Sequence, residues 1–77
     1  MKYLICEDFS GQEVPFIFPR RVDHQDMRDQ LPYAKVTAAG FVELTPQGFH
    51  CYGGNSELGL NARPNDSLIL AEALRQR

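Results

Sequence analysis

The sequence has neither a long hydrophobic run nor a cluster of positive charge. Only a short apolar stretch separates Met1-Lys2 from the acidic pair Glu7-Asp8, which is too short for the core of a signal peptide or for a membrane span. Eight Lys and Arg residues are scattered along the chain and the formal net charge is −2, so the basic surface typical of nucleic-acid-binding proteins is missing. We expect a cytoplasmic protein without a membrane or nucleic-acid partner.

Cysteine and histidine are scarce. The two cysteines form no CxxC pair of the kind that zinc sites use. His50 and Cys51 are neighbours in a predicted strand, where their side chains point to opposite faces. We therefore expect no metal site and no cofactor. In a reducing compartment Cys6 and Cys51 are expected to be buried thiols rather than a disulfide.

Phosphate-binding glycine motifs and obvious catalytic pairs are also missing. Gly53-Gly54-Asn55-Ser56 resembles an anion-binding loop, but it lacks the GxGxxG and GxxxxGK[ST] spacings, so we interpret it as a turn. A nucleophilic Cys6 or Cys51 paired with His24 would need a lowered thiol pKa, which nothing in the sequence indicates. We expect a non-enzymatic protein, and a small Cys/His enzyme stays as an alternative.

The composition is that of an ordinary folded domain. Hydrophobic residues make up 43% of the chain and charged residues 23%, which is too apolar for a disordered tail. With 77 residues the chain is expected to form a single domain, residues 1–77, with a small core and little room for a deep cleft.

The first third of the chain predicts a β-hairpin. Residues 2–9 and 13–19 are rich in strand-forming side chains, and Ser10-Gly11 suits a two-residue loop between them. This loop would place Tyr3 opposite Phe18 on one face and Leu4 opposite Ile17 on the other. The second strand contains Pro15, which cannot donate to a ladder, so we expect that strand to lie at the edge of the sheet or to carry a local irregularity.

A short helix is predicted over residues 22–31. Asp23 is a good N-cap, Asp26 stands where the acid of a capping box belongs, and Val22 and Met27 are placed to form a hydrophobic staple. Met27 and Leu31 give the helix one apolar stripe, and the following Pro32 ends it.

A second hairpin follows the helix. Residues 35–44 are rich in β-branched and small side chains, and Thr45-Pro46-Gln47-Gly48 fits a type I turn closed by a left-handed glycine. This turn would place Thr45 opposite Phe49, Leu44 opposite His50, Glu43 opposite Cys51 and Val42 opposite Tyr52. The small side chains of Ala38-Ala39-Gly40 are expected to receive a closely packed helix.

The last third predicts one helical turn over residues 57–60 and a C-terminal helix that runs to the end of the chain. Asn65, Asp66 or Ser67 would cap this helix, and Arg75 and Arg77 suit its negative end. The predicted fold class is α+β, with element order ββαββα. Two hairpins form a four-stranded, mainly antiparallel sheet, and both helices pack on one of its faces.

Aromatic side chains exceed what one covered sheet face can hide, which favours a protein-binding surface or a homodimer interface. The aromatic candidates for partner binding are Tyr3, Phe16, Phe18, Phe41, Phe49 and Tyr52. Three carboxylates around the first hairpin, Glu7, Asp8 and Glu13, could contact a basic partner.

Four strings of the sequence, EDFSG, VPFIFP, VDHQDM and AAGFVEL, resemble small uncharacterised proteins encoded by bacteriophages and prophages of Gram-negative bacteria. The resemblance covers most of the chain and carries over no binding or catalytic residue. It implies a phage accessory protein that acts in the host cytoplasm by binding a host or phage protein. An anti-CRISPR type inhibitor of a bacterial defence system, acting through an acidic surface, is the alternative within that context.

Overall fold

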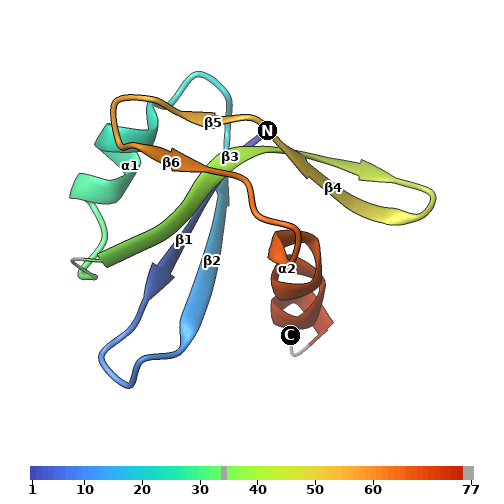
Figure 1. Cartoon of the computed structure of the whole chain (residues 1–77), viewed down its shortest axis with the longest axis horizontal. Helices are drawn as coiled ribbons and strands as arrows, with labels where there is room; N and C mark the ends of the chain where they lie inside the picture. Colours follow the sequence, from blue (N-terminus) through green and yellow to red (C-terminus); the bar gives the residue numbers. More distant parts are fainter. Residues whose placement is uncertain (34, 76–77) are drawn as a thin grey trace.

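The computed structural model describes residues 1–33 and 35–75, which form a four-stranded antiparallel sheet, a small two-stranded ribbon and two helices (Figure 1). This arrangement confirms the α+β class, and the element order agrees with the prediction except for the added ribbon. In chain order the elements are β1 (Lys2–Glu7), β2 (Glu13–Phe18), α1 (His24–Asp29), β3 (Lys35–Thr45), β4 (Gly48–Tyr52), β5 (Gly54–Asn55), β6 (Leu60–Asn61) and α2 (Asp66–Arg75).

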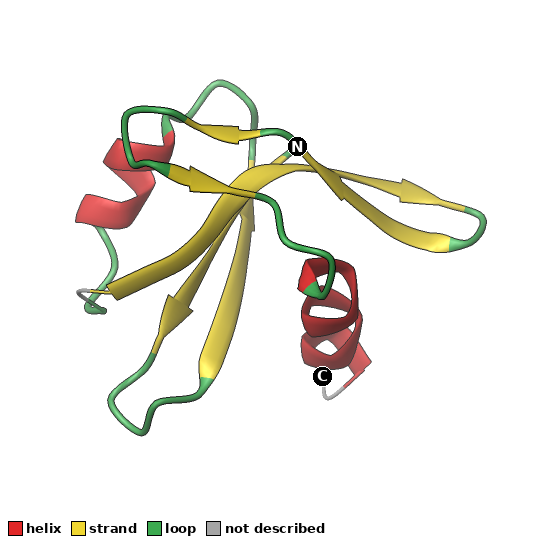
Figure 2. Ribbon diagram, in the orientation of Figure 1, coloured by secondary structure: helices red, strands yellow, loops and turns green. Residues whose placement is uncertain are grey.

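The sheet has the strand order β2-β1-β3-β4, so β2 lies at an edge, as Pro15 predicted. The long strand β3 changes partners along its length, because β1 pairs with residues 35–41 and β4 pairs with residues 41–45. The outer half of the β3–β4 hairpin therefore projects beyond β1 and β2, as Figure 2 shows.

The predicted register of the first hairpin is wrong by one residue. Tyr3 pairs with Ile17 and Leu4 with Phe16, because the loop holds three residues between Asp8 and Gln12 rather than the predicted two. The Asp8 carboxylate accepts hydrogen bonds from the backbone N–H groups of Ser10 and Gln12, both at 2.9 Å. Gly11 completes the loop with φ +88°, as in a type I turn followed by a left-handed residue.

The predicted register of the second hairpin is also wrong by one residue. Phe41 pairs with Tyr52, Glu43 with His50 and Thr45 with Gly48. The Thr45 hydroxyl donates to the Gly48 carbonyl at 2.8 Å, which draws these two residues together across the turn. Gly48 has the predicted positive φ, at +116°.

The helices lie on opposite faces of the sheet, whereas the sequence predicted one shared face. Successive strand residues point to opposite faces, and the buried residues divide accordingly. Tyr3 and Ile5 pack with Ala38 and with Leu70 of α2. On the other face, Leu4, Phe18 and Ala39 pack with Met27 of α1 and with Leu31. Each face therefore has its own core cluster.

The alanines of the predicted small-residue run divide between these two clusters, one on each face. Gly40, the third residue of the run, lets the backbone of β4 approach closely, because a Cβ built at Gly40 would lie 2.7 Å from the backbone oxygen of Tyr52.

Both helices begin where the sequence predicted. Asp23 precedes α1 but makes no capping hydrogen bond through its side chain, so the predicted capping box does not form. At α2, the Asp66 carboxylate accepts a hydrogen bond from the Arg63 backbone N–H at 2.8 Å. The predicted continuation of this helix to Arg77 lies outside the described residues.

The β5–β6 ribbon replaces the helical turn predicted over residues 57–60. The Asn55 side-chain oxygen accepts the Leu58 backbone N–H at 2.9 Å, and the Ala62 N–H donates to the Gly53 carbonyl at 2.9 Å. Leu58 and Leu60 pack against the cluster on the α1 face, while Ala62 packs against the cluster on the α2 face. The ribbon thus covers the part of β3 that β4 leaves unpaired.

Candidate protein-binding surface

A row of stacked side chains begins at the base of the β3–β4 hairpin, where β3 changes partners from β1 to β4. We call Arg20, Phe41, Tyr52 and His50 the aromatic row. The Arg20 guanidinium carbon lies 5.3 Å from the centroid of the Phe41 ring. The Phe41 and Tyr52 rings are stacked at 5.7 Å and 24°, and the Tyr52 and His50 rings at 5.4 Å and 19°. The three rings therefore form a stacked row with a cation at its inner end.

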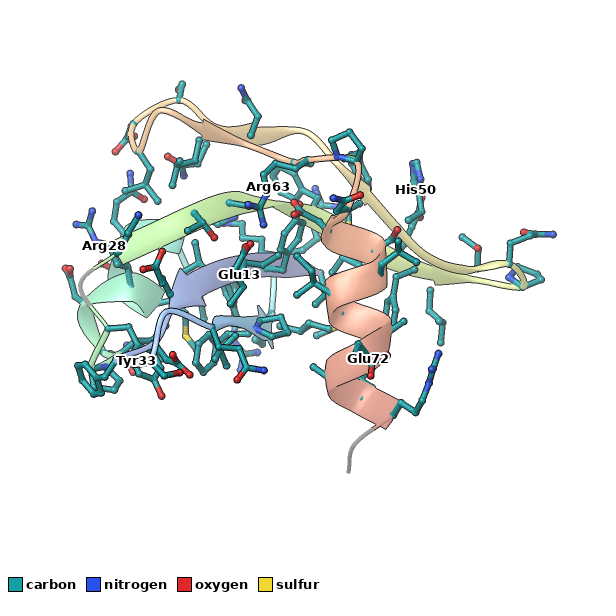
Figure 3. All side chains as sticks on the ribbon, turned by 60° about the horizontal axis from the view of Figure 1, so that its bottom comes forward. Glu13, Arg28, Tyr33, His50, Arg63 and Glu72 are labelled. Atoms are coloured by element: carbon teal, nitrogen blue, oxygen red, sulfur yellow. The ribbon has the colours of Figure 1, made fainter. Side chains whose placement is uncertain are left out.

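The strand pairing explains why these side chains meet. Phe41 and Tyr52 are direct cross-strand partners, and His50 lies two residues before Tyr52, so all three side chains point to one face. This is the face that α1 covers further along β3. Figure 3 shows the His50 side chain pointing away from α2.

His24 of α1 supports the inner end of the row. Its ring makes edge contacts with Phe18 at 5.5 Å and with Phe41 at 5.9 Å. The Asn55 side-chain amide lies 3.1 Å from Nδ1, and the Gly40 carbonyl lies 2.9 Å from Nε2. A neutral ring that accepts at Nδ1 and donates from Nε2 satisfies both contacts. The inner end of the row is therefore fixed by the core.

The outer end of the row is open. Tyr52 is 39% exposed, and His50 is exposed beyond it. Glu43 pairs with His50 across the hairpin and is also exposed, so its carboxylate stands on the same face as the rings. Among the described residues, none makes an ion pair or a side-chain hydrogen bond with Glu43, His50 or Tyr52.

Four of the six predicted aromatic candidates lie outside this row. Tyr3 and Phe18 are 0% and 3% exposed, so they are core residues and the prediction that they form a binding surface is corrected. Phe49 is half-buried against the core cluster on the α2 side. Phe16 is half-buried beside Tyr33, with ring centroids 6.1 Å apart. Of the six predicted aromatic candidates, Phe41 and Tyr52 are the two that belong to the aromatic row.

The three predicted carboxylates are engaged within the chain. Glu7 pairs with Lys35 at 3.2 Å. The Ser10 hydroxyl, and after it the Gln12 backbone N–H, lower the pKa of Asp8 below its usual range. Glu7 and Asp8 therefore do not contribute to an open acidic patch.

Glu13 is the third of these carboxylates, and it pairs with Arg63 (Figure 3). The hydrogen bond from Arg63, supported by the Thr37 hydroxyl at 2.9 Å, lowers the pKa of Glu13 below its usual range. This ion pair links β2 to the segment before α2.

A second aromatic cluster, which sequence reasoning missed, stands at the first hairpin loop. Phe9 is 86% exposed at the loop, and its ring makes an edge contact with Tyr33 at 5.4 Å. Tyr33 also reaches Phe16, so the loop is joined to the segment after α1. The position of Phe9 inside a turn could have indicated its exposure.

The buried polar groups form a network that has a structural role. The Tyr3 hydroxyl donates to the fully buried Asp66 carboxylate, which also accepts Nε of Arg63 at 2.9 Å. Burial, followed by Asp66, raises the pKa of Tyr3 far above its usual value. Arg63 continues the network to Glu13. These contacts join β1, β2 and α2.

The cysteines do not fit the alternative of a Cys/His enzyme. Both are free, and burial raises the pKa of Cys6 and, with a further contribution from Asp66, that of Cys51. The thiol rather than the nucleophilic thiolate is therefore favoured. Both ring nitrogens of His24 are engaged by Gly40 and Asn55, so this histidine is not paired with a thiol.

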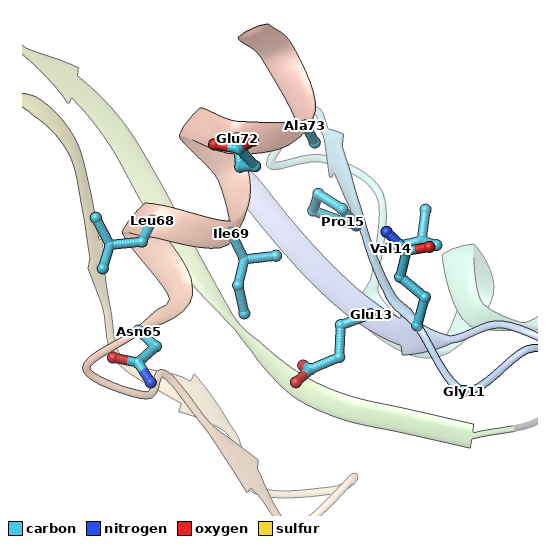
Figure 4. A pocket seen from close by; sticks show the side chains of 10 residues that line it. Gly11, Glu13, Val14, Pro15, Asn65, Leu68, Ile69, Glu72 and Ala73 are labelled. Atoms are coloured by element: carbon cyan, nitrogen blue, oxygen red, sulfur yellow. The ribbon is translucent and has the colours of Figure 1, made fainter. Parts of the chain in front are cut away.

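An open cleft of about 920 Å³ lies between β2 and α2 (Figure 4). Its lining mixes apolar and polar side chains, among them Pro15, Leu68 and Ile69. The two carboxylates in this lining are Glu13 and Glu72, and each already pairs with an arginine of the chain. The cleft therefore has less free polar chemistry to offer than the aromatic row.

Within residues 1–33 and 35–75, no group of three or more His, Cys, Asp or Glu side chains is arranged to hold a metal ion. No helix in this part of the chain has the length and apolar character needed to cross a membrane.

Comparisons of the chain with protein-family models, with curated proteins and with solved structures found no match. Function is therefore inferred from the side chains that the surface presents.

Proposed function

We propose that this chain is a non-enzymatic protein-binding module, and that the aromatic row is its contact surface. The proposal includes the context implied by the sequence resemblance, a phage or prophage accessory protein that binds a host or phage protein in the bacterial cytoplasm. The observation that carries it is the open outer end of the row, where Tyr52 and His50 stack without cover on a projecting hairpin.

The chemistry of the row supports protein binding. Tyr and Arg are enriched at protein interfaces and dominate their binding energy, because they combine large apolar area with polar groups. The row is also held in place before any partner arrives, since His24 and Gly53 pack against Phe41 at its inner end. A preorganised surface loses less conformational entropy on binding.

The acidic surface proposed for an anti-CRISPR type inhibitor gains less support. Glu7 and Glu13 pair with Lys35 and Arg63, and Asp8 is held by its own loop. These pairings reduce the negative field that such a surface would direct at a basic nucleic-acid groove. Plaque assays on a defended host would test the alternative; protection that disappears in Glu7→Gln and Glu13→Gln variants would favour it over the aromatic row.

Affinity capture from a Gram-negative host lysate, with matched surface variants, tests the proposal. Tyr52→Ala should abolish retention of a partner that the unmodified chain retains. Leu68→Ala is the matched control, because Leu68 is 68% exposed on α2, on the opposite face. Light scattering on the purified chain would show whether the partner is a second copy. Retention that survives Tyr52→Ala, or that Leu68→Ala abolishes instead, would contradict the proposal.

A further inference from the structure

We propose that the outer end of the aromatic row binds an arginine side chain of a basic protein segment. This inference rests on the proposed function and names the chemistry of the partner. The site consists of the Tyr52 and His50 rings together with the Glu43 carboxylate, which lies across the hairpin from His50.

Arg20 already makes this kind of contact within the chain. Its guanidinium carbon lies 5.3 Å from the Phe41 centroid, at the inner end of the row, although the residue is exposed and free to extend into solvent. Guanidinium groups bind aromatic faces because the ring quadrupole attracts a cation and the planar group stacks on the ring. The outer end offers the same type of ring face with no cation on it among the described residues.

Glu43 makes the outer end selective for a cation. Its exposed carboxylate has no ion-pair partner in the described part of the chain, and it points to the same face as His50. An arginine that stacks on His50, the outermost ring of the row, has a planar fork of donors that can reach this carboxylate. A nucleic acid would instead bring phosphates toward Glu43, and the charges would repel each other.

Arginine fits this combination better than lysine does. The guanidinium can stack on a ring and donate two parallel hydrogen bonds to a carboxylate, whereas the ammonium is a strongly hydrated point charge. The partner chemistry is therefore an accessible segment that carries arginine, and the net charge of −2 favours its approach.

Chemical-shift mapping with short peptides tests the site directly. The probes are a glycine-arginine repeat peptide and the same peptide with lysine or glutamine in place of arginine. Each is titrated into the full chain, followed by amide ¹H–¹⁵N spectra. The arginine peptide should shift amides of residues 41–43 and 50–52, and the lysine peptide should bind more weakly. The glutamine peptide should leave the spectrum unchanged.

Two variants and two matched controls separate the contributions of charge and ring face. Glu43→Gln and Tyr52→Ala should each weaken binding of the arginine peptide by about threefold or more, as loss of one exposed ion pair or cation–π contact does. Asp26→Asn removes another exposed carboxylate, and Phe9→Ala another exposed ring, so both should leave the affinity unchanged.

Several outcomes would overturn the inference. These are shifts that map to the cleft between β2 and α2, affinities that neither Glu43→Gln nor Tyr52→Ala changes, and a stronger response of the same amides to an oligonucleotide. A dimer that Tyr52→Ala dissociates would assign the surface to a second copy. If Tyr52→Ala abolishes partner capture while the arginine peptide gives no shifts, the proposed function stands and this inference is wrong.

Discussion

Removing the hydroxyl of Tyr3 tests whether the buried network holds α2 against strands β1 and β2. Tyr3 and Asp66 are both 0% exposed, and the hydroxyl donates directly to the carboxylate that also binds Arg63. Tyr3→Phe keeps the ring and leaves one acceptor position of a buried, ion-paired carboxylate without its donor. Because a hydrogen bond to a charged group contributes about 1.5–3 kcal/mol, we expect a loss of about 2 kcal/mol in the free energy of unfolding.

Urea denaturation followed by circular dichroism measures this change. For a chain of this size a loss of about 2 kcal/mol corresponds to a fall in Tm of about 8–16 °C, with the slope of the urea transition unchanged. Tyr52→Phe is the matched control, since its hydroxyl makes no hydrogen bond with the described residues and its loss should cost less than about 0.5 kcal/mol. Equal stability losses in the two variants would refute the structural role of the network.

Three further predictions concern stability. The pKa of Glu13 is lowered in the folded state, so its ion pair with Arg63 stabilises the fold above the unfolded-state pKa of Glu13 and is lost as pH falls through the folded-state pKa. Glu13→Gln should therefore flatten the acid limb of a plot of urea midpoint against pH. An unchanged limb would contradict this. Gly40→Ala should cost about 1–3 kcal/mol by crowding the β4 backbone, and a thermal melt without a shift would refute that packing. In the same melts Leu70→Ala should cost about 2–5 kcal/mol and the exposed Leu68→Ala under about 0.5 kcal/mol; equal losses would contradict the assigned core.

Fold class, element order and the edge position of β2 could be predicted because they depend on local signals that the sequence contains. Pro15 placed β2 at the edge, and Asp23 and Pro32 bounded the first helix within a few residues. The placement of the helices could not be predicted in this way. Strands β1 and β3 carry apolar side chains on both faces, so a helix could pack on either face. Only the complete packing shows that α1 covers one face and α2 the other.

The candidate site was only partly predictable, because it depends on strand register. The predicted register placed Tyr52 opposite Val42, whereas the hydrogen bond from Thr45 to Gly48 places Tyr52 opposite Phe41 and His50 opposite Glu43. A shift of one residue changes which side chains share a face. In the first hairpin, the one-residue shift likewise places Phe18 on the same face as Leu4, where both belong to one core cluster.

Site-specific photocross-linking tests the central claim most directly. A benzophenone amino acid is placed at position 52, on the aromatic row, and in a separate variant at position 72, which is exposed on α2. Circular dichroism first confirms that both variants fold. In Gram-negative host cells we expect a discrete cross-linked protein from position 52 and none from position 72. Cross-links from position 72 alone, or none from position 52 while a partner is still captured, would contradict the assignment of the aromatic row as the binding surface.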